Sequence, residues 1–200
     1  MNWIDLRHKA QLIPIFSIND VLKWFPEETE NQVSVQLSRF VSSNQLSQLR
    51  NGLYLLTEYQ INNPFLMANA IRDPSYISLE TALNYYGLIP DIPSAVTSVT
   101  IRKTKTYETP FSKFIYRSIK PDLFFGFEFI RPNPDNNMGY NLALPEKALL
   151  DYLQLNPHIN SLKELRLRKD QDLNQIKMSE FAKHFAYRVQ NLVNQINENE

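Results

Sequence analysis

The side chains best suited to recognise another molecule lie in one short stretch, residues 31–43, where polar and apolar residues are interleaved. Amide and hydroxyl groups form hydrogen bonds with base edges in a DNA groove, and guanidinium groups contact the phosphates beside it. The polar residues that could do this chemistry are Gln32, Ser34, Gln36, Ser38 and Arg39. They can act together only if the local structure places them on one accessible surface.

Two helices joined by a turn would provide that surface. The Ser17 hydroxyl can accept a hydrogen bond from the Asp20 amide, which predicts a short helix that starts there and stops before Pro26. The next helix is predicted over residues 31–43, because its apolar residues have the three- and four-residue spacing of one helical stripe. This stripe consists of Val33, Leu37, Phe40 and Val41. The polar side chains are then left on the opposite side.

A hairpin follows directly. Residues 46–50 and 53–56 are predicted strands, and between them stands Asn51-Gly52, the pair that best tolerates the positive φ angles of a type I′ turn. A helix-turn-helix followed at once by a two-stranded ribbon is the layout of a winged helix. Its second helix enters the DNA major groove and its ribbon meets the backbone. On this interpretation Arg50 and Asn51 contact DNA from the ribbon, and residues 1–12 form a supporting helix.

Charge leaves two interpretations of this N-terminal region open. Residues 1–60 hold five Lys or Arg against six Asp or Glu, whereas the DNA-facing side of a binding module is usually basic. Three helices and a hairpin can also form only a small core, and winged folds also serve as protein-binding modules. The charge of the N-terminal region alone does not decide between these interpretations.

A second stretch, residues 102–120, carries six Lys or Arg against the single Glu108. Such a cluster is either a solvated surface or, beside a helix-turn-helix, a phosphate-contacting one. The candidates for DNA contact in it are Arg102, Lys103, Lys105 and Lys113.

Beyond residue 60 the pattern becomes a mixture of helices and strands. Helices are predicted over residues 65–72, from a Ser78 cap to Gly87, over 146–155, and from Ser179 onward. Segments rich in β-branched and aromatic residues predict strands over residues 96–102, 114–119, 125–131 and 140–144. The predicted fold is α+β: a winged helix-turn-helix over residues 1–60, then a mixed α/β domain over 61–200 with a C-terminal helix.

Catalytic groupings are sparse in this chain. There is no cysteine, the three histidines are isolated from one another, and the four glycines are scattered singly rather than gathered in a phosphate-binding loop. Asp122 and Glu128 suggest a metal-dependent nuclease, but Ile130 stands where such a site needs a lysine. We therefore expect neither enzymatic activity nor a bound cofactor or metal.

Composition points to a globular protein. The chain has 200 residues, 43% of them hydrophobic, with a formal net charge of +0. It has no apolar run near eighteen residues and no basic leader before an apolar stretch, so we expect no membrane association and a cytoplasmic location.

Several segments together resemble the AbiEi family of bacterial antitoxins. They are residues 50–54 (RNGLY), 75–90 (SYISLETALNYYGLIP), 96–100 (VTSVT) and 144–151 (LPEKALLD). The resemblance covers roughly residues 16–155 in the order and spacing of the family. It implies a phage-defence regulator whose winged helix binds inverted repeats in double-stranded DNA at its own promoter and represses that operon. It also implies that the second domain antagonises a nucleotidyltransferase-like toxin. The alternative is a protein-interaction module that neutralises the toxin by direct binding, without significant DNA binding.

Overall fold

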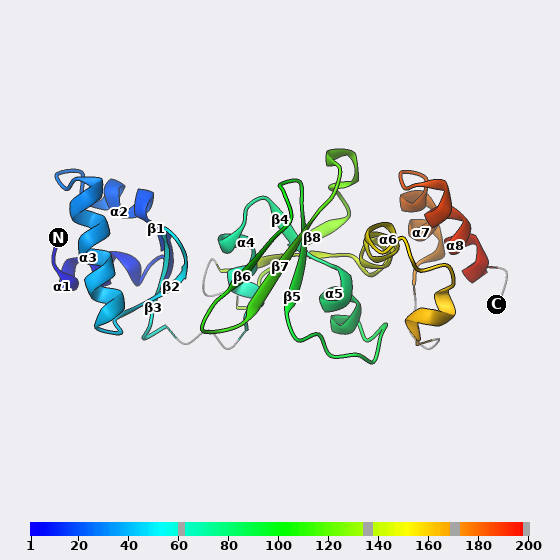
Figure 1. Cartoon of the computed structure of the whole chain (residues 1–200), viewed down its shortest axis with the longest axis horizontal. Coiled ribbons are helices and arrows are strands. Elements are labelled where there is room, and N and C mark those ends of the chain that lie inside the picture. The colour runs from blue at the N-terminus through cyan, green and yellow to red at the C-terminus, as the bar shows by residue number, and fades with distance from the viewer. Residues whose placement is uncertain (60–62, 134–137, 169–172, 198–200) are drawn as a thin grey trace.

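The computed structural model describes residues 1–59, 63–133, 138–168 and 173–197. The molecule is elongated, as Figure 1 shows, with the N-terminal helices at one end, a large sheet in the middle and the last helices at the other end. The boundary predicted between residues 60 and 61 lies outside the described residues.

The N-terminal region contains three helices and a small antiparallel sheet. Its elements are α1 (Trp3–Ala10), β1 (Ile15–Ser17), α2 (Ile18–Trp24), α3 (Glu30–Ser42), β2 (Leu46–Arg50) and β3 (Leu53–Leu56). The strand order is β1-β3-β2. The predicted helices and hairpin strands are confirmed, and only the three-residue β1 was missed.

Local hydrogen bonds set the starts of α2 and α3. Ser17 accepts from the Asp20 amide at 3.2 Å, and Asp20 in return accepts from the Ser17 amide at 2.9 Å, which completes a capping box. Thr29 and Gln32 make the same reciprocal pair at the start of α3. Both helices therefore begin where side chains satisfy their free amides.

Strand β3 is buried on both sides. Tyr54 and Leu56 pack with the core of the N-terminal helices, whereas Leu53 and Leu55 pack into the core of the rest of the chain. Because side chains alternate along a strand, one strand serves two cores. The N-terminal sheet is thus a middle layer that joins the two regions.

The central region is built on a six-stranded mixed sheet with strand order β6-β7-β5-β4-β9-β8. Its strands are β4 (Ser75–Ile77), β5 (Val96–Thr100), β6 (Lys105–Glu108), β7 (Lys113–Ser118), β8 (Phe127–Ile130) and β9 (Tyr140–Ala143). The pairs β5–β7 and β4–β9 are parallel, and the other pairs are antiparallel. All four predicted strands are confirmed. The sequence did not reveal β4, which is short and wholly buried, or β6, which is mostly polar.

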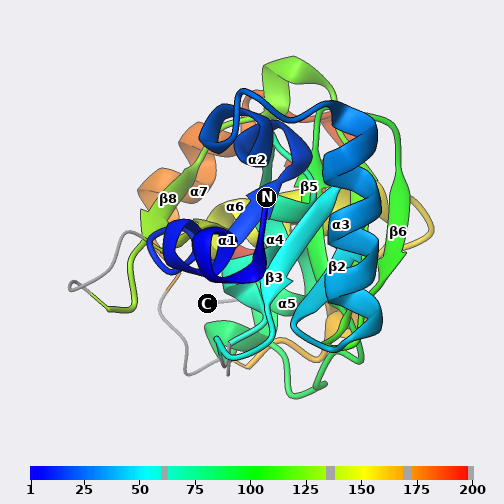
Figure 2. The ribbon, with the colours of Figure 1, turned by 90° about the vertical axis from the view of Figure 1, so that its left-hand side faces the viewer.

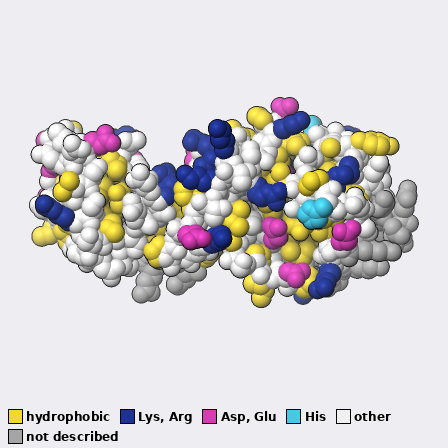
Figure 3. Space-filling model, viewed as in Figure 1, with side chains coloured by type: hydrophobic (Ala, Val, Ile, Leu, Met, Phe, Trp, Pro, Cys, Tyr) yellow, Lys and Arg dark blue, Asp and Glu magenta, His cyan; other side chains and the backbone are white. Residues whose placement is uncertain are grey.

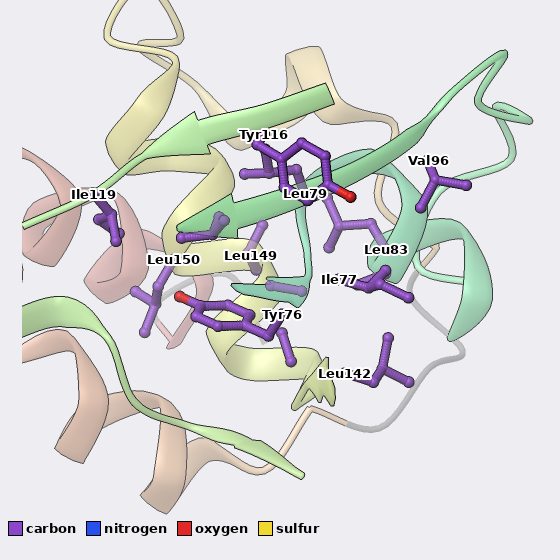
Figure 4. Packing of buried hydrophobic residues seen from close by; sticks show 14 of the residues in the cluster. Tyr76, Ile77, Leu79, Leu83, Val96, Tyr116, Ile119, Leu142, Leu149 and Leu150 are labelled. Atoms are coloured by element: carbon purple, nitrogen blue, oxygen red, sulfur yellow. The ribbon is translucent and has the colours of Figure 1, made fainter. Parts of the chain in front are cut away.

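Helices α4 (Phe65–Ile71), α5 (Leu79–Tyr85) and α6 (Pro145–Leu155) pack with this sheet. Figure 4 shows part of this core, in which Tyr76 from β4 lies beside Leu150 of α6. The short 3₁₀ turns η1 (Pro121–Leu123) and η2 (Leu162–Leu165) complete the connections.

The prediction of one C-terminal helix is wrong. The described residues form two helices, α7 (Gln175–Ala182) and α8 (Tyr187–Asn197), separated by a turn in which Phe185 is buried. Phe185 packs close to Lys147 of α6, with the ammonium nitrogen 5.2 Å from the ring centre. The break in the helix lets this ring reach the core, a long-range contact that a helical stripe does not reveal.

Candidate nucleic-acid interface

Helix α3 presents a free polar face. Its buried side carries Val33 and Leu37, which have no exposed surface, while Ser38 and Arg39 are exposed on the other side. Figures 1 and 2 show α3 along an outer flank of the N-terminal region. The surface predicted over residues 31–43 is therefore accessible.

Two shallow hollows flank Arg39. One is lined by Ser34, Val35, Ser38, Arg39, Ser42 and Ser43. The other is lined by Met1, Glu28, Asn31, Gln32, Val35, Gln36 and Arg39. The structure thus brings all five predicted side chains of this helix to two adjacent hollows with Arg39 between them.

These side chains are not equally free to bind. The amide oxygen of Gln32 accepts hydrogen bonds from the backbone and hydroxyl of Thr29, both at 2.8 Å, so mainly its NH₂ group is left to donate. Ser34 and Gln36 are half-buried, and Ser38 is exposed. The short serine side chains would let the helix backbone approach a groove closely.

Arg39 is the charged group of this face. Its guanidinium group makes no hydrogen bond or ion pair within the described part of the chain, whereas Arg7 pairs with Glu58 at 2.8 Å and Lys23 lies 3.9 Å from Asp20. Its charge is therefore available to a ligand.

Arg50 has a different environment from the one expected at a ribbon tip. It is half-buried, and its Nε donates to the carbonyl oxygen of Ile71 at 2.7 Å. Its Nη1 donates to the carbonyl oxygen of Asn51 at 2.8 Å. Asn51 is exposed, but of the pair only Gly52 has a positive φ, of +72°. A type I′ turn needs positive φ at both positions, so the predicted turn type is wrong, and the pairing of β2 with β3 shifts register between Gln48 and Arg50. Arg50 thus joins the hairpin to α4 instead of projecting into solvent.

The basic segment, which we define as residues 102–105, lies between β5 and the start of β6. Arg102, Lys103 and Lys105 are exposed, and Lys105 lies over the ring of Tyr107 at 5.0 Å. Lys113, on the neighbouring strand, is also exposed but lies 3.6 Å from the carboxylate of Glu108. In Figure 3, dark blue side chains gather near the middle of the long axis. The basic segment therefore has more unpaired charge to offer than Lys113.

Helix α3 and strand β6 lie on the same side of the molecule. The view down the long axis in Figure 2 places both toward the right, and Figure 1 shows that they are separated along that axis. The ribbon therefore has α3 and β6 on one side, although they belong to two regions.

A fully buried polar cluster was missed by the sequence reasoning. The Lys147 ammonium donates to the Asp151 carboxylate and, at 2.7 Å, to the Tyr76 hydroxyl. Tyr76 and Ser78 both donate to the other oxygen of Asp151 at 2.9 Å. None of these side chains is accessible to a substrate, so the cluster is structural. Ser78 also precedes α5 without capping it through its side chain, in contrast to the prediction.

The described residues show no other candidate centre. They contain no group of three or more His, Asp or Glu side chains placed to hold a metal ion. None of the helices in the described ranges combines the length and the apolar character that crossing a membrane demands. Asp122 in η1 and Glu128 in β8 are both exposed, and β8 is the edge strand opposite to β6.

A scan against models of known protein families finds no match, and a search of curated proteins finds no relative. A functional interpretation of this chain therefore rests on its geometry, its charge and the sequence motifs described above.

Proposed function

We propose that this chain is a DNA-binding regulator in which the N-terminal region acts as a winged helix and α3 is the recognition helix. The order of three helices followed by a hairpin is compatible with this fold. The observation that carries the proposal is the accessible face of α3, where polar side chains surround the exposed Val35 and Arg39 lines both hollows.

In the proposed complex α3 lies in the major groove. Ser34 and Ser38 approach base edges closely, and the amide groups of Gln32 and Gln36 reach bases beside them. Arg39 contacts either a phosphate or a guanine edge. The small side chains determine how deeply the helix enters, and the amides and Arg39 supply most of the hydrogen bonds.

The basic segment supplies the phosphate contacts that the N-terminal region lacks. Arg102, Lys103 and Lys105 are exposed at and just before β6, which lies on the same side as α3 in Figure 2, and in the proposed complex they neutralise backbone charge next to the groove contact. Lys113 contributes less, because Glu108 compensates part of its charge. Because positive charge is concentrated in the basic segment, a chain with a formal net charge of +0 can bind a polyanion.

The resemblance to AbiEi antitoxins supplies the biological part of the proposal. The chain would act in the cytoplasm, bind inverted repeats in the promoter of its own operon, and antagonise a nucleotidyltransferase-like toxin encoded beside it. Neither enzymatic activity nor a cofactor is needed for this function.

A protein-interaction module is the second candidate function. Ile176 of α7 and Tyr187 of α8 are apolar side chains with 74% and 76% of their surface exposed. In this candidate function the C-terminal helices bind the toxin directly and DNA binding is insignificant. Co-expression with the product of the neighbouring gene, followed by size-exclusion chromatography, tests it: one joint peak supports the module, and two separate peaks argue against it.

Fluorescence anisotropy with a duplex from the chain's own upstream region tests the DNA-binding proposal. Binding should be tighter than to a scrambled duplex of equal length and should weaken steeply as salt concentration rises. Arg39→Ala should weaken binding to the upstream duplex. If the protein binds neither duplex at low salt, the proposal is wrong.

A further inference from the structure

The C-terminal end of α4 is an unusual junction. The last carbonyl groups of a helix lack partners within the helix and often accept from arginine. Here the Ile71 carbonyl accepts from Arg50 of the hairpin at 2.7 Å. The last residue of α4 is thereby fixed to β2, which follows α3 directly in the chain.

The very next residue makes a second link. The Nη2 of Arg72 donates to the carbonyl oxygen of Lys103 at 2.6 Å, and its Nη1 donates to the hydroxyl of Tyr107 at 3.2 Å. Arg72 thus holds the backbone of the basic segment and the side chain of Tyr107 in β6. Two consecutive residues connect the hairpin on one side and the basic segment on the other.

Apolar packing and one further hydrogen bond keep α4 itself in place. Leu53 and Leu55 of the hairpin belong to the same core cluster as Ala68 and Ile71 of α4. From the sheet side, the Tyr116 hydroxyl donates to the carbonyl oxygen of Ala68 at 2.5 Å. Helix α4 therefore lies between the hairpin and the sheet and is bonded to both.

We propose that Arg50 and Arg72 are positioning residues. Through their bonds at the end of α4, they hold α3 and the basic segment at one fixed separation. The expected effect of this separation on DNA binding rests on the proposed function. A duplex is stiff over the length of a protein, so two contact surfaces bind it together with less loss of conformational freedom when their separation is preset. A preset separation gives the second contact a high effective concentration once the first has formed. Arg50 then acts on binding without touching a phosphate.

The distance between α3 and β6 can be measured without DNA. The natural chain has no cysteine, so Ser38→Cys on α3 and Thr106→Cys on β6 provide two unique sites for spin labels. Pulsed electron paramagnetic resonance should give one narrow distance distribution. Arg50→Met and Arg72→Met should each broaden it, whereas the control Arg102→Met, which removes an exposed arginine without a side-chain bond, should not. An unchanged distribution in both junction variants overturns the inference.

The salt dependence of DNA binding separates positioning from phosphate contact. Lys103→Met should lower the slope of log K against log salt by about one, because it removes a phosphate contact. Arg50→Met should weaken binding by about tenfold or more while keeping the wild-type slope. If Arg50→Met lowers the slope as Lys103→Met does, Arg50 touches phosphate and the inference is wrong.

The two measurements fail independently. If the wild-type protein binds no DNA, the proposed function is rejected, and the distance distributions still decide whether Arg50 and Arg72 couple the two regions. If Arg50→Met does not fold, as judged by circular dichroism, Arg72→Met removes the bonds between α4 and the basic segment instead. Its distance distribution then tests the inference.

Discussion

Lys147 forms an ion pair with Asp151, one turn further along α6, and neither side chain has any exposed surface. The pair holds together three parts of the central region, because Tyr76 from β4 and Ser78 from the start of α5 donate to the same carboxylate. Burial raises the pKa of the Asp151 carboxyl group and lowers the pKa of the Lys147 ammonium group. Each charge is therefore costly without the other.

Removal of one partner should strongly destabilise the protein. We expect Lys147→Met to lower the free energy of unfolding by about 3–5 kcal/mol, because the buried carboxylate loses its cation. Urea denaturation measures this change. The matched control is Lys177→Met on the exposed face of α7, which should change stability by less than about 0.5 kcal/mol. Equal effects of the two substitutions would contradict the structural role of the cluster.

The loss of unfolding free energy in Lys147→Met should become smaller as pH falls. Without the cation, the buried Asp151 carboxyl group is more stable protonated, so its pKa in the folded state lies above the ordinary value of 3.8. The folded state then gains relative stability as pH falls through that raised pKa, and loses it as pH rises. Denaturation at pH 7 and at pH 5 should show a smaller deficit at pH 5. A deficit that grows on acidification would contradict this assignment.

Replacement of both charges should restore part of the stability. Asn at position 151 can still accept from Tyr76 and Ser78 but carries no charge, so Lys147→Met combined with Asp151→Asn leaves no unpaired buried ion. We expect the double variant to be more stable than Lys147→Met alone. With the single variant Asp151→Asn measured as well, the coupling energy of the pair is the loss in the double variant minus the sum of the two single losses. Additive losses would show that the two charges act independently.

Burial raises the pKa of six of the ten tyrosines, and Tyr76, Tyr86 and Tyr116 are shifted furthest. Burial raises the pKa of Tyr86 to about 12, and it raises the pKa of Tyr76 and of Tyr116 further above the usual 10.0. In the unfolded chain these tyrosines ionise at a lower pH than in the folded protein. Their contribution to stability is therefore complete below pH 10 and decreases as pH rises beyond it. Tyrosinate absorbance during an alkaline titration should show a late phase coincident with unfolding by circular dichroism. A single midpoint near pH 10 in a still-folded protein would contradict their burial.

Local chemistry made the N-terminal elements predictable. The turn Asn51-Gly52 determines where the two strands of the hairpin meet, and Ser17 with Asp20 determines where α2 begins. The apolar stripe of α3 likewise identified its buried side, of which Val33 and Leu37 are fully covered. Each of these features depends on residues within a few positions of one another.

The features that were missed depend on distant partners. Arg50 reads as an exposed hairpin arginine until α4 brings the Ile71 carbonyl to it. Lys147 reads as a solvated residue in a first helical turn, yet its charge is buried against Asp151. The candidate interface combines both kinds of information: the polar face of α3 was predictable, whereas the placement of α3 on the same side as β6 was not.

The most direct test of the account is to place a negative charge on the exposed face of α3 and measure binding to the upstream duplex. Ser38→Glu puts a carboxylate where α3 would enter the groove, and its matched control Ser179→Glu puts the same charge on an exposed position of α7. We predict that Ser38→Glu weakens binding more than about tenfold through repulsion from DNA, while Ser179→Glu stays within about twofold of wild type. Equal affinity of the two variants for the duplex would contradict the assignment of α3 as the recognition helix.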